Sequence, residues 1–141
     1  MPNNINELIK WSEASINLEE LDHSDFPNTK IVYGYRDASN YKESAEVVFS
    51  GKFDHELLSK MLDKLQGGMF FIPGQVGLPD IQNKLGGWSE DDHPFHYFLS
   101  IEPTSDVPTE GLLNLQEFVA SFPDVWDATY VPTFVEDKPS L

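Results

Sequence analysis

The sequence has no cysteine and little positive charge. The absence of cysteine excludes disulfide bonds, thiolate metal sites and cysteine nucleophiles. No apolar run reaches the roughly 18 residues that a membrane-spanning helix needs. The first residues, Met-Pro-Asn-Asn-Ile-Asn-Glu, lack the basic segment and apolar run that mark a signal peptide. We therefore expect a cytoplasmic protein with no membrane partner.

Acidic residues far outnumber basic ones. The chain has nine lysines and arginines and 24 aspartates and glutamates, which gives a formal net charge of −15. Phosphate backbones are bound by clustered basic side chains, so we expect no nucleic acid partner. Residues 1–29 carry −5 and residues 85–141 carry −10, whereas residues 30–84 are neutral. The pattern indicates either charge for solubility or a surface that meets a basic protein.

Core-forming residues are nonetheless plentiful. Hydrophobic residues make up 40% of the chain and aromatic residues 13%, which argues against disorder. A length of 141 residues fits one globular domain over residues 1–141, because a chain of this size buries enough surface to fold without disulfides.

Residue patterns predict a helix, a hairpin of two strands, a helix, two strands with a short helix between them, a further helix and a last strand. Apolar residues at helical spacing predict helices over residues 3–15, 54–66 and 111–122, with a short helix over residues 80–85. Strands are predicted over residues 31–36, 45–49, 69–72 and 95–101, and an edge strand over residues 127–135. Residues 69–72 are all apolar, which is typical of a central buried strand. In the next strand Phe95, Tyr97, Leu99 and Ile101 alternate with His96, Phe98 and Ser100.

These elements indicate an α+β fold. The first two strands form an antiparallel hairpin. We expect a mainly antiparallel sheet of about four to five strands, with about three helices packed largely on one face.

One candidate site is the acidic loop that precedes residues 95–101. Two histidines and three acids within seven residues, namely Glu90, Asp91, Asp92, His93 and His96, offer nitrogen and oxygen ligands to a divalent metal. Pro94 breaks a helix here, and His93 and His96 would point to opposite faces of a strand. The alternative is an exposed acidic loop that leads into a strand, and we predict no metal.

A second candidate is the hairpin loop. Arg36 and Lys42 flank a turn built from Asp37 and Asn40, with Tyr41 beside them. Two cations at a turn can hold a phosphate or a carboxylate. The alternative is an ordinary hairpin loop with surface cations, since no nucleophile or base accompanies them.

Other motifs give no support for catalysis. The glycine pairs and loop glycines fit no nucleotide-binding pattern, and no hydrolase or zinc-protease motif occurs. We predict no cofactor. Trp88 and Trp126 lie in the acidic C-terminal third, where exposed aromatics among acids suit a protein interface; the alternative is core packing.

Several segments resemble a family of small, mostly uncharacterised microbial proteins. They include Y-R-D-x-x-N-Y-K at residues 35–42 and F-I-P-x-Q-V-G-L-P at residues 71–79. The resemblance covers about residues 33–98. It implies no catalytic role, because no activity is established for that family.

The leading hypothesis is a non-enzymatic acidic binding protein, resembling an immunity protein or inhibitor, with a basic protein partner. The alternative is a small-molecule or metal enzyme with a site between residues 36–42, 73–79 and 91–96. A third hypothesis is a homodimer that pairs through an edge strand near residues 127–135.

Overall fold

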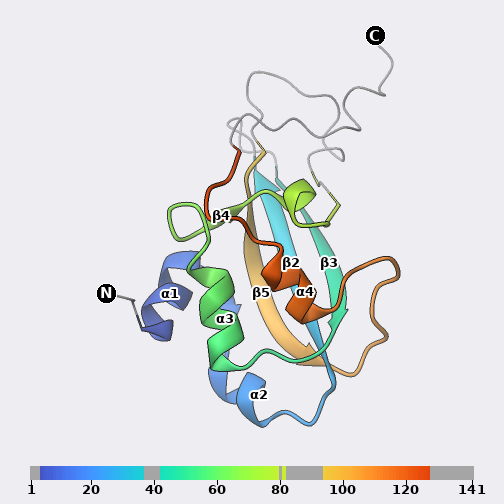
Figure 1. Ribbon diagram of the computed structural model, residues 1–141. Helices are drawn as coiled ribbons and strands as arrows, with labels where there is room; N and C mark the ends of the chain where they lie inside the picture. The colour runs from blue at the N-terminus through green and yellow to red at the C-terminus, as the bar shows by residue number, and fades with distance from the viewer. Residues whose placement is uncertain (1–3, 37–41, 80, 82–93, 128–141) are drawn as a thin grey trace.

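The fold is built around one mixed, mostly antiparallel sheet (Figure 1). A computed structural model describes residues 4–36, 42–79, 81 and 94–127. The strands are β1 (Ser15–Ile16), β2 (Asn28–Arg36), β3 (Lys42–Ser50), β4 (Phe70–Phe71) and β5 (His96–Thr104). They lie in the order β1-β5-β2-β3, and β4 also pairs with β5. Among the described strand pairs only β1 with β5 is parallel.

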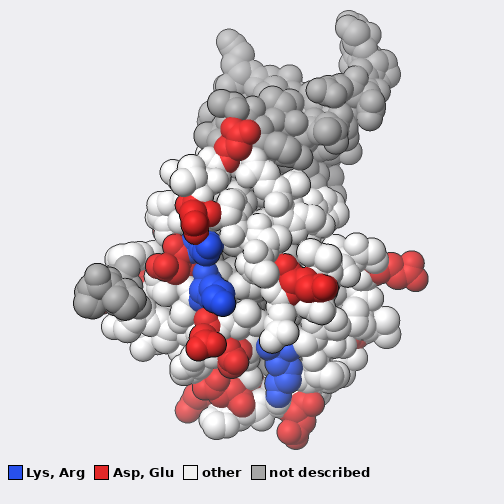
Figure 2. Space-filling view, in the orientation of Figure 1, with Lys and Arg blue, Asp and Glu red and all other residues white. Residues whose placement is uncertain are grey.

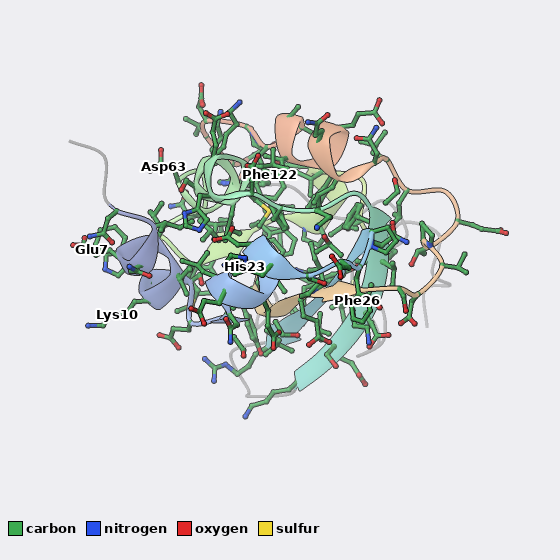
Figure 3. The ribbon with its side chains drawn as sticks, turned by 90° about the horizontal axis from the view of Figure 1, so that it is seen from below. Glu7, Lys10, His23, Phe26, Asp63 and Phe122 are labelled. Carbon is green, nitrogen blue, oxygen red and sulfur yellow. The ribbon has the colours of Figure 1, made fainter. Side chains whose placement is uncertain are left out.

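Four α-helices accompany the sheet in the described part of the chain. They are α1 (Ile5–Ser12), α2 (Leu18–His23), α3 (His55–Leu62) and α4 (Leu115–Ala120). Each follows an asparagine or aspartate whose side chain accepts a backbone N–H of the first turn, namely Asn4, Asn17, Asp54 and Asn114. Figures 1 and 3 both show α3 and α4 lying across one face of the sheet. The predicted α+β fold is therefore confirmed.

The hydrophobic core lies between the sheet and these two helices. Ile31, Tyr33 and Tyr35 of β2 alternate toward the helices, as the period of a strand requires, and all three are 0% exposed. The facing helical residues are Leu58, Met61, Leu62, Leu115, Phe118 and Val119. Phe49 of β3 stacks on Phe118 with their ring centroids 4.4 Å apart.

A β-bulge in β5 changes which residues face the core. Val32 pairs with Ser100 whereas Tyr33 pairs with Phe98, so Leu99 is an extra residue on this strand. His96 and Phe98 are buried before the bulge, and Ile101 is buried after it. The prediction that Ile101 shares a face with Tyr97 and Leu99 was wrong, because strict alternation takes no account of an inserted residue.

Three predicted helices are shorter in the structure, and the one predicted over residues 3–15 spans only Ile5–Ser12. The helix predicted over residues 54–66 ends at Leu62, after which Lys64 and Leu65 donate to the carbonyls of Met61 and Leu62 in tighter turns. Leu65 remains buried, which explains why the apolar spacing continues beyond the helix. The helix predicted over residues 111–122 likewise starts only at Leu115.

The short apolar run at residues 69–72 is not a central strand. It contributes only β4, which pairs with Tyr97 and His96 of β5. β1 pairs with the same side of β5, at Ser100 and Ile101. A 3₁₀ turn, η1 (Pro73–Gln75), follows directly. The predicted helix over residues 80–85 and the predicted strand over residues 127–135 lie almost entirely outside the described residues.

Candidate functional site

The hairpin brings two predicted binding residues together. Arg36, the last residue of β2, lies opposite Lys42, the first residue of β3, and both are exposed. Residues opposite each other in a ladder share a face, so both cations lie on the same side of the sheet. Asp37, Asn40 and Tyr41 lie outside the described residues, and anion binding by this loop stays a prediction.

His96 is part of the packed interior. Its Nε2 accepts the backbone N–H of Ile81 over 3.0 Å, and its Nδ1 lies 3.0 Å from the Pro94 carbonyl oxygen. A ring nitrogen that accepts is unprotonated, so Nδ1 carries the proton and donates to Pro94. The ring is 0% exposed and lies 4.9 Å from the ring of Tyr35. This arrangement suits a buried structural histidine and leaves no nitrogen open for a ligand.

Residues 73–79 approach the same end of the sheet. The Tyr33 hydroxyl donates to the Pro79 carbonyl over 2.7 Å, and Tyr33 also lies beside His96. Two of the three predicted loops therefore meet at β2, but the described residues at this point are packed core. Asp92, His93 and Trp88 lie outside the described residues, so an enzymatic site between the loops stays a prediction.

Trp126 contributes to the core. Its side chain is 5% exposed, its Nε1 donates to the Lys64 carbonyl over 2.7 Å, and its ring meets Phe122 edge-on. Burying an indole requires a partner for its N–H, which this carbonyl supplies. Trp126 therefore follows the alternative given for it in the sequence analysis, which is core packing. Its ring is not exposed to a partner.

The exposed aromatics include two that the sequence did not single out. Phe26 is 49% exposed and Trp11 is 45% exposed. Phe26 follows an acidic segment in which Leu21 is buried, so α2 has one apolar side turned inward and acids elsewhere. The exposure of Phe26 could have been predicted from its position just after a short acidic helix.

A shallow depression beside Phe26 forms what we call the α2 surface. Its lining residues are Glu19, Glu20, His23, Ser24, Phe26 and Pro103. Figure 2 shows acidic side chains gathered at the lower end of the view, where Figure 1 places α2, and Figure 3 looks onto this end with His23 and Phe26 labelled. The depression combines an exposed aromatic ring with negative charge.

The carboxylates around the α2 surface differ in their partners. Asp22 lies 2.8 Å from Nε2 of His55 at the start of α3. Glu19, Glu20 and Asp25 have no ion-pair partner in the described part of the chain. The nearby cation, Lys52, donates to the Ser24 backbone carbonyl. Three carboxylates are therefore available to an incoming cation.

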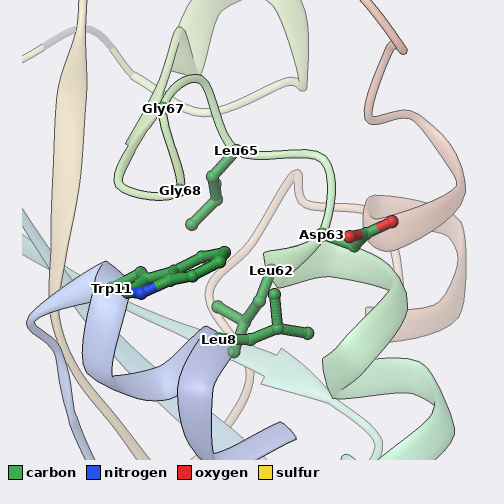
Figure 4. A pocket seen from close by; sticks show the side chains of 7 residues that line it. All are labelled: Leu8, Trp11, Leu62, Asp63, Leu65, Gly67 and Gly68. Carbon is green, nitrogen blue, oxygen red and sulfur yellow. The ribbon is translucent and has the colours of Figure 1, made fainter. Parts of the chain in front are cut away.

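Trp11 lies over a second depression, between α1 and the turn after α3. Leu8, Leu62 and Leu65 line it together with the turn at Gly68 (Figure 4). Asp63 lies at the rim, and its carboxylate points away from the indole in Figure 4. The depression offers apolar surface without polar groups that converge on it, so it gives little specificity for a ligand.

One exposed carboxyl has a clearly shifted pKa. Lys64 donates a hydrogen bond to Asp124 Oδ1 over 2.6 Å. This hydrogen bond, and after it the positive charge of Lys64, holds the pKa of the Asp124 carboxyl below its ordinary value. The carboxylate is 88% exposed, so the pair is a surface feature.

The described residues include no group of three or more histidines and acids placed to hold a metal ion. They also include no helix with both the length and the apolar character needed to cross a bilayer. No family model, curated protein or solved structure matches the chain, so the resemblance seen at residues 35–42 and 71–79 stays a prediction.

Proposed function

We propose that this protein is a non-enzymatic binding protein whose α2 surface docks onto a basic segment of a partner protein. The observation that carries the proposal is that Glu19, Glu20 and Asp25, near the half-exposed ring of Phe26, have no ion-pair partner among the residues that the structure describes.

The two components of this surface have different roles in binding. An exposed aromatic ring supplies most of the affinity when a partner buries it, because aromatic side chains bury large areas at low entropic cost. Carboxylates around it select a positively charged partner and speed the encounter. The net charge of −15 extends the same attraction over a longer range.

The class of partner follows from the charge. A strongly acidic protein repels nucleic acid and anionic membranes, which leaves a basic protein as the complementary target. Small acidic domains that neutralise basic nucleases or toxins have a similar size and charge. By this physical analogy, the proposal includes an immunity-like or inhibitor-like role in the cytoplasm.

The test uses a synthetic peptide of lysines and arginines around one central phenylalanine. In a titration followed by amide NMR shifts, we expect changes to gather at residues 18–26 and at the neighbouring residues 102–104. A peptide with glutamates in place of the basic residues serves as the charge control. Shifts scattered over the molecule, or equal binding of both peptides, would contradict the proposal.

Matched variants separate local from overall charge. Glu19→Gln with Glu20→Gln removes two charges at the α2 surface, and Asp63→Asn with Glu110→Gln removes two charges elsewhere. We expect about a fivefold loss of affinity for the first pair and little change for the second, because close charges contribute most. Phe26→Ala should weaken binding about tenfold. Equal losses from the two charge pairs would count against docking at α2.

A further inference from the structure

The residues of the α2 surface differ in chemistry and come from different elements. Glu19 and Glu20 belong to α2. Phe26 lies in the segment after this helix (Figure 3), and Pro103 lies in β5. The depression that they line has a volume of about 530 Å³, within the usual range of ligand pockets. It therefore combines acidic residues from the helix with apolar residues from the following segment and the sheet.

Several contacts hold this part of the chain in place. Leu21 of α2 is 4% exposed, and Asp22 on the same helix lies 2.8 Å from Nε2 of His55. The Phe26 N–H donates to Oγ of Ser24 over 3.0 Å, which fixes the turn that carries the aromatic ring. A surface held in this way loses little conformational entropy when a ligand binds.

An arginine side chain is complementary to both the aromatic and the acidic residues of this surface. Its guanidinium group is planar, so it stacks on an aromatic face and also donates paired hydrogen bonds to a carboxylate. The ammonium group of lysine is a compact, strongly hydrated charge that lacks this flat face and paired geometry. Phe26 is 49% exposed, and in the described part of the chain Glu19 and Glu20 form no ion pair.

We propose that the α2 surface selects arginine over lysine in its basic partner, an inference that rests on the docking function proposed above. One arginine side chain of the partner lies against the ring of Phe26 and donates hydrogen bonds to Glu19 or Glu20. The other basic residues of the partner supply long-range attraction, for which lysine serves as well as arginine. The target is therefore an arginine-bearing segment of a basic protein.

The test compares two forms of the basic peptide used for docking, one with arginine and one with lysine at every basic position. Alanine replaces the central phenylalanine in both forms, so that only the basic side chains can stack. We expect the arginine form to bind about fivefold more tightly, because stacking and paired hydrogen bonds each add a modest gain. Titrations followed by amide NMR shifts measure both affinities.

The outcomes separate arginine selection from docking itself. Equal affinities of the two forms, with shifts that still gather at residues 18–26, would overturn arginine selection while docking stands. If the parent peptide with phenylalanine binds there and neither alanine form does, arginine does not make the contact and the inference is refuted. If the parent peptide also fails to bind, the docking function fails, and arginine selection fails with it.

Matched variants locate the contact on the protein. Phe26→Leu keeps an apolar side chain but removes the aromatic face, and we expect the preference for arginine to fall from about fivefold to about twofold. Trp11→Leu removes the other half-exposed ring, at the second depression, and should leave the preference unchanged. The side-chain protons of the bound arginine should also shift upfield through the ring current of Phe26. An unchanged preference in Phe26→Leu, or no upfield shift with the natural chain, would refute the contact.

Discussion

At the scale of single residues, His96 has a structural role that its residue type alone would not predict. It lies at the start of β5, fully buried among Tyr33, Tyr35 and Phe71. Its two ring nitrogens bridge the backbones of Ile81 and Pro94. His96 therefore links the backbone at Ile81 and Pro94 to the core through hydrogen bonds, and its role is structural.

His96→Phe should keep the ring packing while leaving the Ile81 N–H and the Pro94 carbonyl without their partner. We expect the free energy of unfolding in urea to fall by about 2–4 kcal/mol, because unpaired buried polar groups are costly. His55→Ala is the control, since His55 is exposed and loses only its surface contact with Asp22; its cost should stay below about 1 kcal/mol. Equal losses from the two variants would argue against the buried bridge.

The exposed pair of Lys64 and Asp124 predicts a local pH effect. Lys64→Ala should raise the pKa of Asp124 toward its ordinary value, whereas Lys60→Ala, which removes the same charge without contacting Asp124, should leave it nearly unchanged. Carboxyl titration by NMR measures both. Since the folded pKa is lowered, the small stabilisation by this pair is present above the ordinary carboxyl pKa and disappears as pH falls through the lowered value. An unchanged Asp124 pKa in Lys64→Ala would contradict the assigned cause.

At the scale of elements, the turn between α3 and β4 depends on two glycines. Gly67 and Gly68 have φ angles of 60° and 81°, in the left-handed region that other residues avoid. A Cβ on Gly68 would lie 3.1 Å from Cβ of Trp11, whereas a Cβ on Gly67 would meet no atom within 4 Å. The turn at Gly68 is therefore constrained by packing as well as by backbone conformation.

Gly68→Ala and Gly67→Ala form a matched pair. Both introduce left-handed strain of about 1 kcal/mol. Gly68→Ala also pushes against α1, so we expect its total cost to reach about 2 kcal/mol and the fluorescence of Trp11 to shift. Urea unfolding and emission spectra measure the two effects. If Gly67→Ala were the more destabilising, the close contact with Trp11 would be of no energetic importance.

At the scale of the whole molecule, the charge balance predicts how stability responds to salt. With 24 acids against nine basic residues, repulsion outweighs the ion pairs, which in the described part of the chain involve exposed or half-exposed side chains. Raising the ionic strength from 0.01 M to 0.15 M shortens the screening length from about 30 Å to about 8 Å. We expect the free energy of unfolding to rise by about 1 kcal/mol.

Thermal and urea unfolding at several sodium chloride concentrations test this expectation. A variant with Glu7, Glu56 and Glu110 changed to glutamine should show a smaller salt dependence, because it carries less charge to screen. If salt instead lowered the stability, attractive ion pairs would dominate over repulsion.

The sequence by itself determined the elements whose signals are local. The start of α3 after Asp54 agrees with the helix predicted over residues 54–66, and the alternation of Tyr33 and Tyr35 marks the buried face of β2. The period of apolar residues in α3 likewise identified its buried stripe. These features follow from backbone hydrogen bonding and residue spacing within a few positions, so no knowledge of the fold is needed to find them.

Only the tertiary structure decided which surfaces are covered. The bulge at Leu99 reversed the facing of Ile101, and the burial of Trp126 and His96 removed two candidate binding residues from the surface. Phe26 and Trp11, which the sequence did not distinguish from other aromatics, are exposed. Burial depends on partners far away in the chain, such as the Lys64 carbonyl for Trp126, and spacing along the sequence carries no record of those partners.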